Sequence, residues 1–245
     1  MEASIMDGSG CKAGAVTQLS MTKNPIFLAK LVMKHQPNGH CFLAGPEGEE
    51  FGASLGLVPV PQQYFDTELR YKQHLAGLHC DNAKAIVSED FRGEPCAIKE
   101  SGSLDSPRGT VGAVALDSRG NLAAATSTGG MTNKFESRIG DTPIIGAGTY
   151  AENGVVAVSA TGDGEKFIRT CVAYDVAAQI KYSGKSVGEA AEYTLERVET
   201  IEGNGGLIAV DSKGNISMPN SSGMFRGWID ARGEAHVAIF VDDEC

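Results

Sequence analysis

The sequence predicts a layered sandwich, of either the α/β or the α+β class, with sheets inside and helices outside. Short apolar runs typical of buried strands occur in both halves of the chain, and helical patterns stand between them. Glycine is frequent, at 31 of 245 residues, whereas aromatic residues make up only 7%, which favours tight turns and closely packed strands. A hydrophobic content of 42% is enough for one sizeable core, so we expect a single domain.

The N-terminal part predicts a hairpin followed by a helix. Residues 2–6 and 13–19 have strand patterns on either side of an Asp-Gly-Ser-Gly turn. Asn24 and Pro25 are typical of the N-cap and the first position of a helix. We expect a short strand near 41–43 and helical turns at 47–55 and 62–78. The predicted buried residues of the first helix are Phe27, Leu28, Leu31 and Val32.

The composition changes sharply in the middle of the chain. Residues 80–109 have no hydrophobic periodicity and are rich in Ser, Glu, Asp, Gly and Pro, which is typical of a mobile linker. Thr110 then begins an apolar run, 110–116, that predicts a fully buried strand. Residues 122–128 form the second strand of its hairpin around an Asp-Ser-Arg-Gly-Asn turn. A closely similar strand-turn-strand pattern recurs at 207–218.

Two further helices follow a buried strand predicted at 155–160. The first is expected over 165–182, because its apolar residues recur every four positions. The second begins with Ser186 and Glu189, the spacing of a capping box. The buried row of the first helix is Ile168, Val172, Val176 and Ile180, beside Phe167 and Cys171.

Charge and cysteine usage exclude several function classes. A net charge of -10 without a basic cluster argues against nucleic acids and anionic membranes as partners, which leaves small molecules or peptides. The six cysteines form no C-x-x-C pair and are expected as reduced thiols of a cytoplasmic protein. No stretch is long enough to cross a bilayer, and the N-terminus lacks a signal-peptide pattern. The five histidines, at 35, 40, 74, 79 and 236, lack ligand spacing, so no metal or other cofactor is expected.

Gly109 and Thr110 form a candidate self-processing site. If the bond between them were cut, Thr110 would carry a free α-amine beside its hydroxyl, and an amine of pKa about 8 can accept the hydroxyl proton. Gly109 is able to adopt the backbone conformations that expose its carbonyl to attack. A Gly-Thr pair before a strand is nevertheless common, so the dipeptide alone also fits an ordinary strand entry.

Several longer motifs resemble the plant-type L-asparaginase and isoaspartyl peptidase (beta-aspartyl-peptidase) family. They lie at residues 110–117, 121–130, 138–143 and 146–151, and weaker likenesses occur at 2–8, 14–16 and 24–26. Members are N-terminal-nucleophile hydrolases, so the resemblance implies an α+β fold, an αββα sandwich of two antiparallel sheets between helix layers. It also implies self-cleavage at Gly109–Thr110 into an α subunit, 1–109, and a β subunit, 110–245. A homodimer of αβ units is implied in the same way.

The resemblance also assigns the reaction and its nucleophile. Thr110 would form an acyl-enzyme with the side-chain carbonyl of L-asparagine or of a β-aspartyl (isoaspartyl) dipeptide, which water then hydrolyses. Thr128 would orient the Thr110 hydroxyl. Thr161 and the amide of Gly162 would form the oxyanion hole.

Three more residues are implied as substrate clamps. Arg138 would pair with the α-carboxylate and Asp141 with the α-ammonium of an L-aspartyl group. The carbonyl of Gly164 would add a contact to the ammonium. Without the motif, Arg138 and Asp141 would be read as a solvated loop pair.

Two departures from the family keep alternatives open. Asp163 is more similar to the related glycosylasparaginases, whereas residues 167–169 resemble the isoaspartyl peptidases, so cleavage of a glycan–asparagine link is an alternative activity. Family members also carry an upstream segment with a sodium-binding loop, and this chain begins after it, so sodium is not carried over. A shortened, non-catalytic relative with a structural or assembly role is the alternative from another class.

Overall fold

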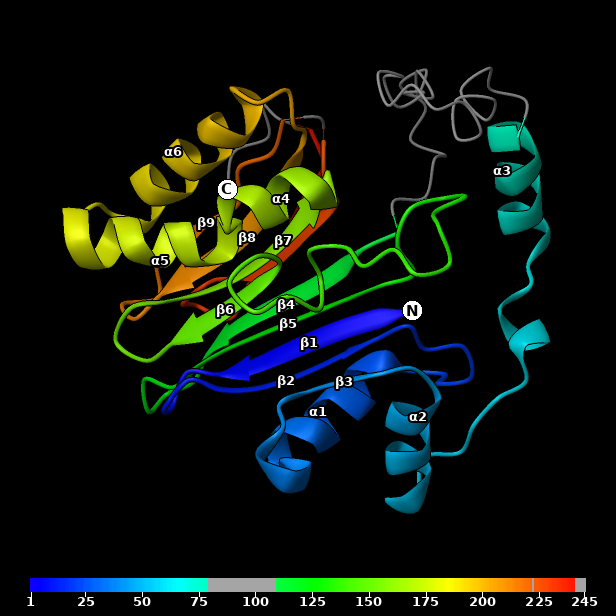
Figure 1. The fold of residues 1–245 in the computed structure, drawn as a ribbon. Coiled ribbons are helices and arrows are strands. Elements are labelled where there is room, and N and C mark those ends of the chain that lie inside the picture. Colours follow the sequence, from blue (N-terminus) through cyan, green and yellow to red (C-terminus); the bar gives the residue numbers. More distant parts are fainter. Residues whose placement is uncertain (79–108, 222, 241–245) are drawn as a thin grey trace.

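The computed structural model describes residues 1–78, 109–221 and 223–240 and has the α+β class that the sequence predicts. Two sheets are stacked face to face, with helices outside both, so the layers follow the order αββα (Figure 1). The predicted linker, 80–109, lies outside the described residues except for Gly109. Among the described helices, none has both the length and the apolar composition that crossing a membrane requires.

The first sheet has the strand order β3-β2-β1-β5-β4 and joins strands from both halves of the chain. All its neighbours are antiparallel except β2 and β3, which are parallel. Its strands are β1 (Glu2–Asp7), β2 (Lys12–Thr17), β3 (Phe42–Ala44), β4 (Val111–Leu116) and β5 (Leu122–Thr128).

The second sheet is antiparallel throughout, in the order β6-β7-β8-β9. A separate hairpin, β10-β11, follows it along the chain. These strands are β6 (Thr149–Glu152), β7 (Val156–Gly162), β8 (Gly205–Asp211), β9 (Ile216–Ser217), β10 (Arg226–Ile229) and β11 (Ala235–Ala238).

Five of the described α-helices lie on the two outer faces of the sandwich, and α3 stands apart from both sheets (Figure 1). Helices α1 and α2 lie on the side of the first sheet, and α4, α5 and α6 on the side of the second (Figure 1). Helix α6 begins with the predicted capping box, formed by Ser186 and Glu189. The helices are α1 (Pro25–His35), α2 (Gly45–Ser54), α3 (Glu68–Leu78), α4 (Gly164–Thr170), α5 (Val172–Ser183), α6 (Val187–Glu199) and two 3-10 turns, η1 (Pro37–Gly39) and η2 (Gln62–Phe65).

The core consists of three apolar clusters, one at each interface between neighbouring layers of the sandwich. Burial on both sides explains why Val156, Ala157 and Val158, consecutive residues of β7, are all inaccessible to solvent. One cluster joins the first sheet to α1, the next lies between the sheets, and the third joins the second sheet to α5 and α6. Central residues of these clusters are Val16 and Leu28, then Met6 and Leu122, then Phe167 and Val176.

The prediction that 110–116 is a fully buried strand is wrong. Among the described strands, β4 lies at the edge of its sheet and pairs with β5 alone, and Val111 is 67% exposed. One face of the strand packs between the sheets through Val114 and Leu116, whereas Ala113 and Ala115 on the other face are exposed. A run of small apolar residues does not reveal whether a second strand or a helix will cover it.

Two helix predictions also need correction. The helix expected over 165–182 is two helices, α4 and α5, because Cys171 has a left-handed backbone (φ 51°) and is exposed. The helical turns expected at 62–78 are present as η2 and α3. Phe27 of α1 is 54% exposed, while Ala29, which was not predicted, is buried.

Three hairpins close with the same hydrogen-bonded turn. In each, one carboxylate oxygen of an aspartate accepts the backbone N–H groups two and four residues later. In the first two turns, an asparagine side chain also donates to the second carboxylate oxygen of the aspartate. The aspartates are Asp117, Asp211 and Asp230, of which the third was not predicted from the sequence.

A chain of buried hydroxyl groups connects the two sheets. Ser4 of β1 donates to Thr149 of β6 (2.7 Å), which donates to Thr126 of β5 (2.6 Å). Thr126 in turn lies 3.1 Å from the Gly148 carbonyl oxygen and 2.7 Å from Ser159 Oγ of β7. These hydroxyls are shielded from water, so each depends on its neighbours for its hydrogen bonds.

We predict that Thr126→Val destabilises the protein although the two side chains have nearly the same volume. The substitution leaves the hydroxyls of Thr149 and Ser159 without this partner, which costs about 1–3 kcal/mol. Urea denaturation measures the effect, and Thr126→Ser, which keeps the hydroxyl and loses only a methyl group, is the matched control. A valine variant as stable as the wild type would show that the chain does not hold the sheets together.

Candidate active site

Thr110 lies at the start of β4, directly beside the end of β5. The register pairs Val111 with Ser127, so Thr110 and Thr128 are adjacent across the hairpin. The Thr110 hydroxyl donates to Thr128 Oγ1 over 3.1 Å, and the N–H of Gly130 donates to the same oxygen over 3.0 Å. Thr128 is thereby oriented by the backbone and can in turn orient Thr110.

The second sheet brings the end of β7 to the same end of the sandwich. Gly112 of β4 faces Ser159 of β7 so closely that a Cβ atom would collide with the serine Oγ. At the other end of β4, Leu116 lies against Gly214. Gly214 comes shortly after the end of β8, and that end of β8 pairs with the start of β7. Strands β4 and β7 therefore run in opposite directions, and the first residues of β4 share an end with the last residues of β7.

Thr161 and Gly162 are the last two residues of β7 at this end. They pair with Gly206 and Gly205 of β8, and Gly162 is exposed. A Cβ atom on Gly162 would collide with the carbonyl of Asn204 and lie 2.6 Å from the Phe167 ring, so this position requires glycine. The backbone here leaves the sheet and enters α4 (Figure 1).

Arg138 and Asp141 lie on the loop between β5 and β6 and meet at Gly164. A Cβ atom on Gly164 would lie 2.6 Å from Arg138 Nη2 and 3.0 Å from Asp141 Oδ1. Asp141 is buried, only 6% exposed, and its Oδ2 has no hydrogen-bond partner among the residues that the structure describes. The reading of this pair as a solvated loop pair is therefore wrong for Asp141.

Burial raises the pKa of Asp141 from 3.8 to about 7. The Arg138 guanidinium opposes this shift, while the carboxylates of Glu2 and Glu165 reinforce it. A buried carboxylate with an unused oxygen is a site that a cation would stabilise, because the cation would replace the lost hydration.

Sequence reasoning missed two acidic residues around Arg138. Glu165, in the first turn of α4, accepts hydrogen bonds from Arg138 Nε (2.8 Å) and Nη2 (2.9 Å). Glu2 is buried beside Thr128, and its carboxylate accepts from the Gly140 N–H (3.0 Å) and from the Thr17 hydroxyl (3.1 Å). The signal for Glu2 was a charged residue at the start of a strand with a buried pattern, because a buried carboxylate requires polar partners.

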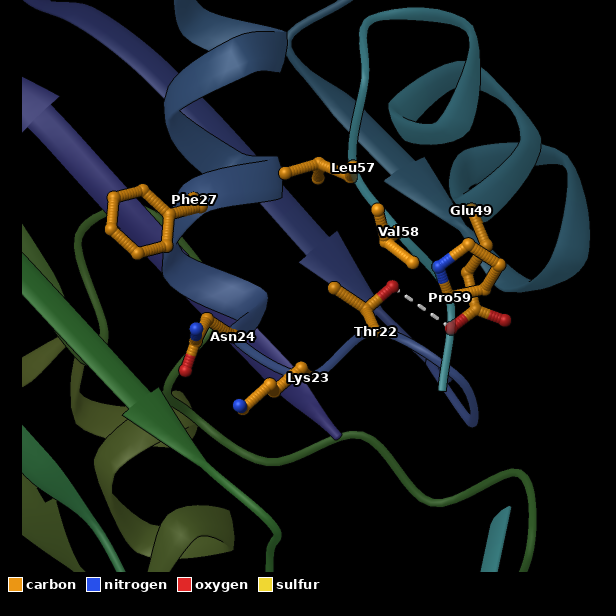
Figure 2. Close-up of a pocket in the computed structure, with 8 residues that line it drawn as sticks. All are labelled: Thr22, Lys23, Asn24, Phe27, Glu49, Leu57, Val58 and Pro59. Carbon is orange, nitrogen blue, oxygen red and sulfur yellow. Dashed lines mark hydrogen bonds between the residues drawn. The ribbon is translucent and has the colours of Figure 1, made fainter. Parts of the chain in front are cut away.

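A cavity of about 150 Å³ lies elsewhere, beside α1 and α2 (Figure 2). Glu49 forms part of its wall, and the carboxylate is saturated by the hydroxyls of Ser20 and Thr22 and by the N–H groups of Ser20 and Met21. None of the residues predicted for catalysis or substrate binding lines this cavity. We assign it no role in the chemistry of Thr110.

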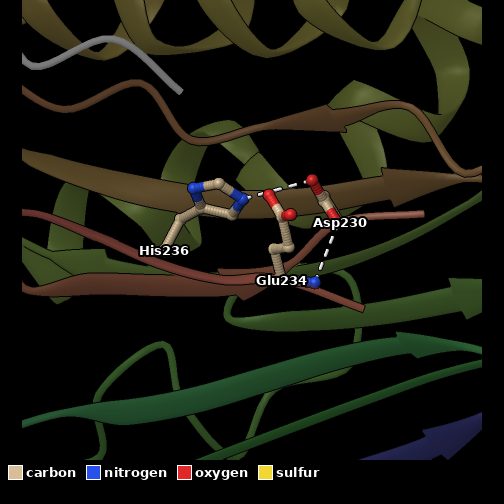
Figure 3. Close-up of side chains that lie close together, drawn as sticks. All are labelled: Asp230, Glu234 and His236. Atoms are coloured by element: carbon tan, nitrogen blue, oxygen red, sulfur yellow. Dashed lines mark hydrogen bonds and ion pairs between the residues drawn. The ribbon is translucent and has the colours of Figure 1, made fainter. Parts of the chain in front are cut away.

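Asp230, Glu234 and His236 form a cluster of metal-ligand types on the β10-β11 hairpin (Figure 3). The turn already accounts for this cluster: Asp230 accepts backbone N–H groups, and Arg232 forms ion pairs with both carboxylates (3.1 and 3.0 Å). The imidazole of His236 lies 3.2 Å from Asp230 Oδ2 and stacks on the Trp228 ring. The guanidinium already pairs with both carboxylates, so their charges are balanced without an ion, and we assign no metal centre to this cluster.

The raised pKa of Asp141 predicts a pH-dependent contribution to stability. Between pH 3.8 and about 7 the folded protein holds a proton that the unfolded chain releases, so the free energy of unfolding falls as the pH rises through this range. Asp141→Asn removes the dependence and should stabilise the protein more at pH 8 than at pH 5, by about 1.4 kcal/mol for each pH unit between 5 and the folded pKa of about 7.

Urea denaturation of wild type and Asp141→Asn at both pH values measures this difference. Glu192→Gln, on an exposed position of α6, changes the net charge equally and is the control. An asparagine variant whose gain is the same at pH 5 and pH 8 would contradict the raised pKa.

Comparison with known proteins adds an independent finding. The family described as Asparaginase matches residues 1–239. An isoaspartyl peptidase of Escherichia coli is 46% identical over 230 residues, covering 93% of this chain and 68% of that protein. A putative isoaspartyl peptidase/L-asparaginase of Dictyostelium discoideum is 47% identical, covering 94% and 70%. The human isoaspartyl peptidase/L-asparaginase is 40% identical, covering 99% and 73%.

These matches confirm the resemblance that the motifs around Thr110 indicated. They extend over both halves of the chain, including the strands that lie before the predicted cleavage site. The chain belongs to the asparaginase family.

Proposed function

We propose that this protein is a threonine hydrolase that releases ammonia from L-asparagine and hydrolyses β-aspartyl dipeptides. The observation that carries the proposal is the hydrogen bond from the hydroxyl of Thr110, the residue directly before β4, to Thr128. The names of the relatives, isoaspartyl peptidase and isoaspartyl peptidase/L-asparaginase, support the substrate class. A non-catalytic role is not favoured, because Thr110, Arg138 and Asp141 lie at one end of the sandwich in an arrangement suited to hydrolysis.

The first step of the proposed mechanism is cleavage of the chain at Gly109–Thr110. The Thr110 oxygen attacks the Gly109 carbonyl carbon, the C–N bond breaks, and the threonine nitrogen takes up the hydroxyl proton. Water then hydrolyses the resulting ester and frees the Gly109 carboxylate. Gly109 lies beside Thr128: a Cβ atom added at Gly109 would be 3.8 Å from Thr128 Oγ1. Thr128 is thereby near both partners of the reaction.

The freed α-amine of Thr110 then acts as the base for substrate hydrolysis. The amine accepts the hydroxyl proton while Thr110 Oγ1 attacks the side-chain carbonyl of the substrate. Thr161 and the N–H of Gly162 stabilise the oxyanion, and ammonia or an amino acid leaves with the proton. Water releases L-aspartate from the acyl-enzyme.

The substrate clamps follow from charge and burial. Asp141 offers its unused carboxylate oxygen to the α-ammonium, and the Gly164 carbonyl adds a second acceptor. Arg138 pairs with the α-carboxylate. Both clamps require a free L-aspartyl group, which explains a preference for asparagine and for dipeptides linked through the side chain.

The two proposed subunits, 1–109 and 110–245, would remain one folded unit after cleavage. Strand β1 from the first pairs along its full length with β5 from the second, and Ser4 donates to Thr149 across the sandwich. Assembly as a homodimer of αβ units and a cytoplasmic location complete the proposal. The exposed free thiols at Cys11, Cys41 and Cys171 fit a reducing compartment.

The sequence feature that suggested a glycosylasparaginase has a structural explanation. Asp163, between two glycines, accepts the backbone N–H of Asn204 (3.0 Å) and so anchors the loop before β8. This role does not require contact with a glycan. The remaining motif, residues 167–169, favours isoaspartyl substrates.

We predict that Thr110→Ala abolishes both self-cleavage and hydrolysis, because no other hydroxyl occupies the start of β4. Intact mass spectrometry after prolonged incubation should give fragments 1–109 and 110–245 for the wild type and a single chain for the variant. Thr110→Ser keeps the hydroxyl and is the control, with slower but detectable cleavage. Residual hydrolysis by the alanine variant would remove Thr110 from the mechanism.

We also predict a clear substrate preference. Processed protein should release aspartate from β-aspartyl dipeptides and ammonia from L-asparagine, and should leave N-glycosylated asparagine intact. Aspartate release measured by coupled assay compares the three substrates. Turnover of the glycosylated substrate alone would select the glycosylasparaginase alternative.

A further inference from the structure

We infer that Glu165 is a positioning residue that holds Arg138 apart from Asp141 and so keeps both charges available to a zwitterionic substrate. The inference rests on the proposed function of Arg138 and Asp141 as clamps. It assigns to Glu165 a task that neither the sequence motifs nor the comparisons indicate.

The first observation is how Glu165 binds the guanidinium. Its two carboxylate oxygens accept from Nε and Nη2 of Arg138, so they occupy one edge of the planar group. A guanidinium has five N–H groups, and the edge formed by Nη1 and Nη2 remains for a second carboxylate. Glu165 therefore does not compete for the edge that a substrate can use.

The second observation is the separation of Arg138 from Asp141. Both side chains lie over Gly164, yet no ion pair within 4.0 Å joins them, and Asp141 Oδ2 has no partner among the described residues. Opposite charges this close in a buried setting attract strongly. The contact that the Arg138 side chain does make is the bidentate bond to Glu165.

The burial of the three groups explains why Glu165 is suited to this task. The Glu165 side chain is 56% exposed, so water solvates it whether or not Arg138 is bound. The Arg138 side chain is only 16% exposed, and without Glu165 the nearest carboxylates would be the buried Asp141 and, from β1, Glu2. Pairing with Asp141 would neutralise the two substrate clamps against each other.

A direct test measures the pKa of Asp141 in unliganded protein. The carboxyl carbon signal of Asp141, assigned by its loss in Asp141→Asn, is titrated by carbon NMR in wild type, Glu165→Gln and Glu165→Ala. Glu165→Gln removes the like charge but keeps an acceptor for Arg138, so the pKa should fall slightly from about 7. Glu165→Ala frees Arg138 to pair with Asp141, so the pKa should fall further, by at least one additional unit.

Kinetics provide the second measurement. Glu165→Ala should raise KM for L-asparagine about tenfold or more and change kcat less than threefold, because the lost arrangement acts on binding. The acid limb of kcat/KM should move to lower pH with the pKa of Asp141. Glu165→Gln should lie between this variant and the wild type, and Glu192→Ala should match the wild type.

The outcomes separate the two proposals. Equal pKa shifts in the alanine and glutamine variants, or a fall in kcat at constant KM, would overturn the role of Glu165. An inactive, uncleaved wild type would overturn the proposed function, and the titration would still decide whether Glu165 keeps Arg138 from Asp141.

Discussion

The buried hydroxyl chain from Ser4 through Thr149 to Thr126 is the contact on which the arrangement of the two sheets depends. Apolar contacts hold the sheets together without directional preference, whereas hydrogen bonds between shielded hydroxyls are directional and favour one relative position. The candidate site depends on the relative position of the two sheets because its residues come from both of them. Thr110 and Thr128 belong to the first sheet, and Thr161 ends a strand of the second.

The electrostatics of the site are unbalanced in the unliganded protein. Three carboxylates, those of Glu2, Asp141 and Glu165, influence one guanidinium, that of Arg138. Burial, reinforced by the charges of Glu2 and Glu165, leaves Asp141 with a pKa near 7 and an unused oxygen, at a cost in stability that grows from pH 3.8 and is complete above about pH 7. Under the proposed function, the α-ammonium of the substrate would supply the missing positive charge.

The sequence predicted the parts of the fold that have local signals and failed where only tertiary packing decides. The hairpins, the capping box at Ser186 and the position of Thr110 follow from residue patterns over a few positions. The exposure of Val111 depends on β4 being an edge strand, and the break at Cys171 depends on a backbone angle that cysteine seldom adopts. Glu165 escaped notice because its partner, Arg138, is 27 positions away in the sequence.

The repeated aspartate turns have a consequence for how the chain reaches its fold. Asp117, Asp211 and Asp230 each bind the backbone of residues within four positions, so these hairpins can set their own register before distant strands meet. Hairpins of this kind form within about 1–10 μs, far ahead of the pairing between β1 and β5 across more than a hundred residues. We therefore expect the β4-β5 ribbon that bears Thr110 to form early, and the pairing of β1 with β5 to be the slower event that completes the candidate site.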